Sequence, residues 1–530
     1  MASVPFSLPQ DYWKTLNLGK KDLEFLSNHL FENETPLTKE ELVSVLVDER
    51  IHLERESLTK QQRSMGKTYL PEGHYKPGEI LVFPALDWKK GKVTSVRPGV
   101  NPALGDFEVI AVEFEGEGEK SFATKLADHK LNQPVEISID DQNLNPENVL
   151  KTFGAELEQK LDATLSGDDD LVKVAARWFP RALLVDINVG QLNLAEAVLD
   201  EAAAGKPLST SALIEQLEIS GKVNPKLIEF SINRALQEDG RFDEVGPAGE
   251  VLWFLKRLEP QDVQQIPVPL RYTEIPYQRS ALTPEMLALE AELDDELADI
   301  EPPAGDASEA TICLSYPHWR AGTLPVSARV RNFFPTAYES PRIRFMLVDG
   351  HTQEEFPAWV VRQHGYVVGL SALYQKYGLT PGSLITVAKG KKPGQVLVTP
   401  RIHRPTRDWV RTVLVGSDGR IVFATLKQNL TSEFNERMIL SVPDPAGVDE
   451  ACAQIAKLHL PFEQLVADMM RELIKLNPQG HVHAQELYSA INILRRCPPG
   501  ALLVFLTSSS NYKHVGDLHY RLAETEAENA

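Results

Sequence analysis

Lysine and arginine side chains crowd one part of this 530-residue chain, between residues 311 and 411. The segment holds 14 Lys and Arg against 5 Asp and Glu, a net charge of +9, whereas the whole chain carries −20. Cations grouped on one domain suit contacts with phosphates, and arginine can also read guanine through two hydrogen bonds. The candidates for contacting nucleic acid are Arg329, Arg331, Arg342, Arg344, Lys389, Lys391, Lys392, Arg401, Arg404, Arg407 and Arg411.

An acidic stretch just before this segment offers a second interpretation of the same charges. Residues 281–310 contain ten Asp and Glu and neither Lys nor Arg. The basic segment could therefore hold this stretch, or an acidic partner protein, in place of DNA or RNA. The interpretations can coexist, because a tethered acidic segment can compete with nucleic acid for one basic face.

The usual signatures of catalysis are missing from the sequence. It has no Gly-x-x-x-x-Gly-Lys-Ser/Thr loop, no Gly-x-Gly-x-x-Gly turn, no Gly-x-Ser-x-Gly elbow and no His-Glu-x-x-His motif. Asp349, Glu354 and Glu355 fall at an expected turn and form no clear metal site for a nuclease. His481 and His483 lack a nearby cysteine, so no zinc site is predicted, and His483 is expected either to cap a helix or to lie at the surface. We expect a protein that is not an enzyme and needs no cofactor or metal; a protein-interaction scaffold is the alternative and a nuclease or other hydrolase ranks third.

The elements that position these residues begin with an N-terminal helical domain at residues 1–70. Its clearest signal is a capping box formed by Thr38 and Glu41. Residues 71–135 change to short strands separated by Gly and Pro, which is typical of a small antiparallel barrel. The run at residues 91–97, Gly-Lys-Val-Thr-Ser-Val-Arg, resembles the opening strand of SH3-like barrels of the KOW and Tudor kind.

Residues 146–257 return to helix and end in a unit of three helices and a hairpin. Helices start near Ser209 and at Asn224-Pro225, and two strands flank a turn at residues 246–249. With Gly240-Arg241-Phe242 and Trp253-Phe254-Leu255, this unit is similar to the winged-helix domain of the bacterial RNA polymerase delta subunit. Its third helix would present a contact surface that carries carboxylates as well as cations, which favours a protein partner over DNA; the contact residues are Lys226, Asn233 and Arg234.

The same pattern recurs toward both ends of the chain. Pro36-Leu37-Thr38 superposes on Pro207-Leu208-Ser209, and Val482-His483 repeats the spacing without the proline. Residues 461–523 are a possible C-terminal winged helix, with a helix at 462–476 and a hairpin running from 501–506 back to 518–522. The N-terminal copy lacks a matching wing, so a winged helix is less expected there.

Residues 258–310 are predicted to be an acidic linker, and residues 311–411 a basic β-barrel. The expected strands are 326–332, 343–348, 355–361, 384–388 and 395–399, with one helix at 371–377. This helix followed by Gly378-Leu379-Thr380-Pro381-Gly382-Ser383 resembles the DNA-binding pseudobarrels, although those often have Asp where Ser383 stands. A mixed α/β bridge is expected at 412–460 and an acidic tail at 524–530.

These observations predict a multidomain protein of the α+β class, built from winged-helix-like units and small antiparallel β-barrels. No run of about 18 apolar residues predicts a membrane span, and the N-terminus lacks the features of a signal peptide. Three widely spaced cysteines, Cys313, Cys452 and Cys497, argue against a disulfide framework and for the cytoplasm. The expected partners are DNA or RNA through residues 311–411, with protein partners possible through the winged helices.

Overall fold

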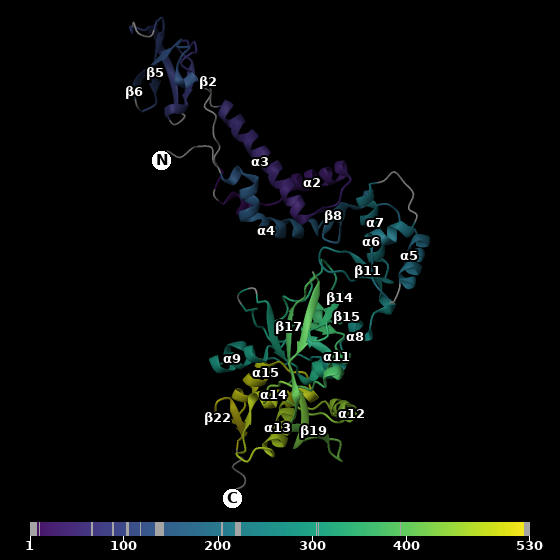
Figure 1. Ribbon diagram of the computed structural model, residues 1–530. Helices are drawn as coiled ribbons and strands as arrows, with labels where there is room; N and C mark the ends of the chain where they lie inside the picture. Colours follow the sequence, from purple (N-terminus) through teal and green to yellow (C-terminus); the bar gives the residue numbers. More distant parts are fainter. Residues whose placement is uncertain are drawn as a thin grey trace. The chain divides into compact units, whose positions relative to one another are not determined.

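The computed structural model describes residues 8–9, 11–64, 67–86, 89–101, 105–116, 118–132, 142–202, 205–217, 224–303, 305, 307–392 and 394–523. The chain forms two compact units (Figure 1). The first unit is Met1–Asp186 with Lys222–Ser231, and the second is Ile187–Gly221 with Ile232–Ala530. Helices and several small sheets make up both units, which confirms the predicted α+β class. The acidic tail at 524–530 lies outside the described residues.

The first unit is built on helices α2 (Lys20–Asn33), α3 (Lys39–Ser64) and α4 (Pro146–Leu165) with the hairpin β7 (Leu171–Val174) and β8 (Arg177–Pro180). Their apolar side chains share one core, which includes Leu46 and Phe179 together with Trp13 of the short helix α1 (Tyr12–Thr15). The strand β1 (Leu37–Thr38) pairs with β8. This wing was not predicted from the sequence, because a five-stranded sheet separates β7 and β8 from α2 and α3 along the chain.

The inserted segment forms a five-stranded sheet of β2 (Lys67–Thr68), β3 (Ile80–Phe83), β4 (Lys89–Pro98), β5 (Glu108–Phe114) and β6 (Gly118–Thr124). They pair in sequence order, antiparallel except for β2 with β3. Tyr75, Phe83 and Phe114 are buried in its core. The expected change from helix to short strands after residue 70 is therefore confirmed.

The second unit contains the helices α5 (Val189–Glu201), α6 (Thr210–Gln216) and, from Ile232 onward, α7 (Pro225–Glu238). The short strand β9 (Leu208–Ser209) pairs with β11 (Leu252–Leu255), which pairs in turn with β10 (Phe242–Glu244). Trp253 holds these elements together, because its indole N–H donates to Asn233 Oδ1 at 2.9 Å. The predicted order of three helices and a hairpin is therefore present.

The C-terminal residues fold in the same order. Helix α13 (Phe462–Ile474) is followed by β21 (Val482–His483), α14 (Ala484–Leu494), α15 (Pro499–Ser508) and the hairpin β22 (Tyr512–Gly516) and β23 (His519–Leu522). Residues 501–506, expected to be a strand, lie in α15 instead. A short apolar run fits a buried helix as well as a buried strand, and Pro499 in the first helical turn favours the helix.

Among the described residues, three sheets share one topology. Each contains a two-residue strand that pairs with the second strand of a later hairpin: β1 with β8, β9 with β11 and β21 with β23. The second residue of each short strand also caps the next helix. Thr38 Oγ1 accepts a hydrogen bond from the Glu41 amide at 3.2 Å, Ser209 Oγ from Ala212 at 3.3 Å, and His483 Nδ1 from Gln485 at 3.1 Å. These three parts of the described chain therefore share one arrangement of helices, a short strand and a hairpin. The sequence predicts this arrangement at 204–257, whereas the C-terminal hairpin lies at 512–522 and not at the expected 501–506, and in the first unit a five-stranded sheet is inserted between the helices.

The His483 cap makes the stability of the C-terminal domain sensitive to acid. Burial, with the nearby charge of Arg437 and the ring of His519, lowers the pKa of His483 to about 4. The unfolded chain binds this proton near pH 6.5, so stability present above that pH is lost as the pH falls toward 4, by about 3 kcal/mol at most. His483→Asn keeps an N-cap acceptor and removes the titration. Urea unfolding between pH 7 and pH 4 should show a shallower loss in this variant, with the exposed His514→Asn as the matched control; parallel losses in the two variants would contradict the assignment.

The basic segment forms most of a seven-stranded sheet in the second unit. The strand order is β12 (Glu309–Cys313), β17 (Leu384–Lys389), β18 (Gln395–Pro400), β14 (Arg342–Asp349), β15 (Glu355–Val361), β16 (Tyr366–Val368) and β13 (Thr323–Pro325). All pairs are antiparallel except β14 with β18, and α11 (Ser371–Tyr377) packs against the same core. Four of the five expected strands and the expected helix are thus present. Residues 326–332 form turns instead, in which Ser327 accepts hydrogen bonds from the amides of Val330 and Arg331.

The acidic stretch before this sheet is a packed element, whereas the sequence predicted a linker. Helix α9 (Pro284–Leu293) buries Met286 and Leu289 in the core of the C-terminal domain, and it lies beside α15 (Figure 1). Its apolar spacing of three residues gives it a face to bury. Two carboxylates of the acidic stretch form ion pairs with arginines outside it. Arg279 contacts Glu290 of α9 at 2.8 Å, and Arg496 contacts Asp295, just after α9, at 2.6 Å.

A long two-stranded ribbon connects the basic sheet to the C-terminal core. It consists of β19 (Ile402–Val415) and β20 (Ile421–Ser432), and it is followed by α12 (Pro445–Lys457). Val413 and Phe423 pack into the C-terminal core, while Val410 and Leu430 contact Ile439. The predicted mixed bridge at 412–460 therefore contains the end of β19, the strand β20 and the helix α12. No helix in the described ranges is long and apolar enough to cross a membrane.

Candidate anion-binding pocket

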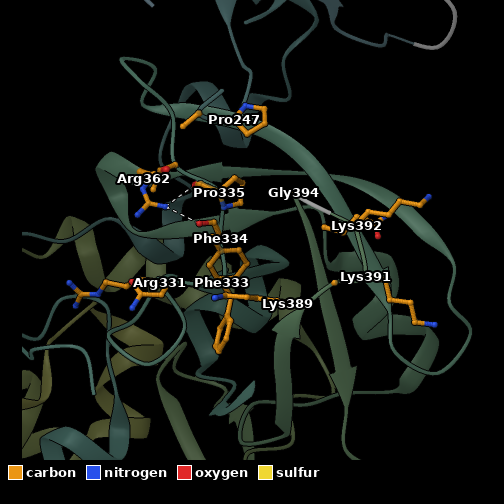
Figure 2. Close-up of a pocket in the computed structure, with 15 residues that line it drawn as sticks. Pro247, Arg331, Phe333, Phe334, Pro335, Arg362, Lys389, Lys391, Lys392 and Gly394 are labelled. Atoms are coloured by element: carbon orange, nitrogen blue, oxygen red, sulfur yellow. Dashed lines mark hydrogen bonds between the residues drawn. The ribbon is translucent and has the colours of Figure 1, made fainter. Parts of the chain in front are cut away.

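A pocket of 740 Å³ opens beside one end of the basic sheet. One wall is the turn that follows β17, with Lys389, Lys391 and Lys392. The opposite wall is the turn region around Arg331, held by the buried rings of Phe333 and Phe334. Figure 2 shows the arginines on one side of the pocket and Lys391 and Lys392 on the other, with the two phenylalanines between them.

The lining of this pocket is strongly positive. Five cations line it, and no carboxylate occurs among the described lining residues: the cations are Arg331, Arg362, Lys389, Lys391 and Lys392. One of these cations also contacts a carboxylate outside the lining, since Glu355 lies 3.3 Å from Lys392. Like charges held around one cavity raise the local positive potential and favour an anion there.

The two arginines are held by backbone carbonyls in place of carboxylates. Arg362 Nη1 donates to the Pro335 carbonyl at 2.8 Å, and Arg331 Nη2 donates to the Ile300 carbonyl at 3.1 Å. Burial, and then the charge of Arg331, lower the pKa of Arg362. The Nε of Arg331 is buried and donates to no acceptor among the described residues. Among the described residues neither guanidinium forms an ion pair with a carboxylate, so both keep their positive charge beside the pocket.

Three further arginines of the predicted set are engaged within the protein. Arg342 contacts Glu259 at 2.8 Å and Asp243 at 3.1 Å. Arg344 lies over the ring of Phe254, and burial lowers its pKa. Arg329 donates from its guanidinium to the Ala291 carbonyl and from its amide to Asp294. Arg329 therefore contacts the acidic stretch through a carbonyl and, from its backbone amide, through one carboxylate. None of these three arginines lines the pocket.

The last four predicted cations do not line the pocket. Arg401, at the end of β18, pairs with Glu433 at 2.9 Å. Arg411 is nearly buried in β19 and lies 3.4 Å from Glu486. Arg404 and Arg407 are exposed on the ribbon. The cations of the basic segment thus lie in different places: some line the pocket, and Arg404 and Arg407 are exposed on the ribbon.

The predicted contact residues of the second winged helix have different environments. Asn233 is buried and accepts hydrogen bonds from Trp253 and Thr210, so it is removed from any contact surface. Arg234 pairs with Glu238 one turn along α7. Lys226 is exposed. The prediction that Asn233 lies on a contact surface was wrong. Helical spacing alone does not show that the side-chain amide of Asn233 accepts a hydrogen bond from the buried indole of Trp253.

Sequence reasoning missed Arg362, because it stands alone after an apolar strand with no neighbouring cation to draw attention. It also missed Trp409 and Lys427, which lie opposite each other on the ribbon. The alternation of Arg407 and Trp409 was a usable signal for a strand with an exposed face. In the described part of the chain, no group of three or more His, Cys, Asp and Glu is placed to hold a metal ion.

Comparison with protein-family models, with curated proteins and with solved structures finds no match to this chain.

Proposed function

We propose that this protein binds nucleic acid, and that the cationic pocket beside the basic sheet contacts its phosphates. The observation that carries the proposal is the lining of that pocket, with five cations and no carboxylate among its described residues. A cavity of 740 Å³ is larger than a single phosphate needs, so a polyanion suits it better than a lone inorganic ion.

The surrounding charge pattern supports a contact confined to this domain. The chain as a whole carries −20, which repels nucleic acid from most of its surface. Within the basic segment, Arg342 and Arg401 pair with carboxylates away from the pocket, whereas five other cations line it. We also propose the cytoplasm as the location, where the three cysteines, all free thiols, remain reduced.

Salt dependence provides the test of this proposal. The full-length protein is titrated into fluorescently labelled pools of single-stranded DNA, double-stranded DNA and RNA at 50 mM and 200 mM salt. Neutralising about five phosphates gives a slope of log affinity against log salt of about −3.5 for a single strand and about −4.5 for a duplex. Between 50 mM and 200 mM salt the affinity should therefore fall roughly 100-fold for a single strand and about 500-fold for a duplex. Fluorescence anisotropy measures both affinities. An absence of binding to all three pools at 50 mM salt would overturn the proposal.

A further inference from the structure

The exposed face of the ribbon carries a second cationic surface, apart from the pocket. In β19, Arg407 and Trp409 are two residues apart and so point to the same face. Their partners across the ribbon are Asn429 and Lys427. The opposite face is the one that buries Val410 and Leu430. We call Arg407, Trp409, Lys427 and Asn429 the ribbon platform.

Trp409 is unusual in this protein because its indole is open to solvent. It is 66% exposed, whereas Trp13, Trp178, Trp253 and Trp359 are each at most 5% exposed. The ammonium of Lys427 lies 5.2 Å from the centre of its ring, which holds the indole in place by a cation–π contact. A large apolar ring kept at the surface by a cation is an energetic cost that a partner stacked on it would remove.

The chemistry of the ribbon platform selects a nucleobase as this partner. A flat aromatic ring stacks on any unpaired base, and the flanking Arg407 and Lys427 supply the positive charge that follows the phosphates. Asn429 Oδ1 accepts a hydrogen bond from Arg407 Nε at 3.4 Å, and the amide NH₂ of Asn429 can donate to a base edge. In a duplex the bases are already stacked on each other, so a base free to stack on Trp409 must come from a single strand.

We infer that the ribbon platform binds single-stranded nucleic acid by stacking a base on Trp409, an inference that rests on the proposed function and names its substrate class. The contact is independent of sequence, since every base has a flat face. The stacked base itself adds affinity to the phosphate contacts without adding to the number of counterions released.

The test compares two probes on the full-length protein. One is a single-stranded oligothymidine, and the other is an abasic oligonucleotide of the same length and charge. The wild type should bind oligothymidine about tenfold more tightly than the abasic probe, and Trp409→Ala should remove this difference without changing the salt slope. Trp409→Phe, which keeps a ring, should retain most of the difference. Phe31→Ala, at an exposed aromatic residue of α2, is the matched control and should behave as the wild type.

The outcomes separate this inference from the proposed function. Binding of both probes with equal affinity by the wild type would overturn base stacking and leave the phosphate contacts standing. Binding of neither probe at low salt would overturn both proposals. If Trp409→Ala instead abolishes self-association seen by sedimentation while oligothymidine binding is unchanged, the platform is a surface for a second copy of the chain, and base stacking is rejected.

Discussion

Replacing Lys391 and Lys392 by glutamate should weaken the binding of nucleic acid on the order of 100-fold at 0.1 M salt. The two lysines stand on one wall of the pocket, so the double change removes two phosphate contacts and places negative charge beside those that remain. The slope of log affinity against log salt should fall in magnitude by about 1.5. Anisotropy titrations at several salt concentrations measure both quantities with the probes used for the wild type.

Lys20→Glu with Lys21→Glu provides the matched control for this experiment. These lysines are also adjacent and exposed, at the start of α2 in the first unit, so the variant carries the same change in net charge. If binding is lost equally in both double variants, the effect comes from net charge alone and the pocket is not the contact surface. Because the altered lysines are exposed in both cases, thermal unfolding should stay close to that of the wild type.

Replacing Arg496 by methionine should destabilise the C-terminal domain by about 3–5 kcal/mol. Arg496 is buried and contacts both oxygens of Asp295, at 2.6 and 2.8 Å, and Glu296 at 2.7 Å. Burial alone would raise the pKa of Glu296, but the attraction of Arg496 and then of His318 outweighs it and holds that pKa well below its ordinary value. Without Arg496, two carboxylates remain in the core with too little positive charge. Urea unfolding followed by circular dichroism measures the loss.

The pH dependence of the Arg496→Met variant has a definite sign. Without the attraction of Arg496, burial raises the pKa of Glu296 above that of the unfolded chain, so protonation at low pH relieves this carboxylate in the folded state. The difference from the wild type should therefore narrow as the pH falls toward 4. Adding Asp295→Asn and Glu296→Gln should recover part of the lost stability at pH 7, since it removes the stranded charges.

An exposed ion pair on a neighbouring helix gives the control for this prediction. Arg471 contacts Asp468 at 2.7 Å on α13, and both side chains are largely open to water. Arg471→Met should cost less than about 1 kcal/mol, because water already solvates both charges. Equal effects of Arg471→Met and Arg496→Met would contradict the role assigned to the buried cluster.

The sequence predicted local structure well wherever one signal acted over a short range. The capping box at Thr38 and Glu41, the helix at 371–377 and the strands from 343 to 399 lie where periodicity and capping place them. The strands predicted at 326–332 and 501–506 were both wrong, and for the same reason. Short apolar runs do not distinguish strand, helix and buried turn, because all three bury their side chains.

Local sequence patterns could not predict which strands and which charges far apart in the chain lie together. The wing of the first winged-helix-like domain lies after an inserted five-stranded sheet, so no contiguous stretch contains the whole domain. The acidic stretch looked like a linker because its composition is that of a solvated segment. Its partners, among them Arg496, are about 200 residues away in the chain, and only the folded protein brings the charges together.

The sequence by itself determined that positive charge is concentrated between residues 311 and 411, because composition does not depend on folding. Tertiary structure decided which of those cations remain available to a ligand. Arg342 and Arg411 are taken up by carboxylates of other segments, whereas Arg331 and Lys391 meet around a pocket that also gains Arg362. The physical reason is that the field at any point sums over charges in space, and folding sets those distances without regard to their order along the chain.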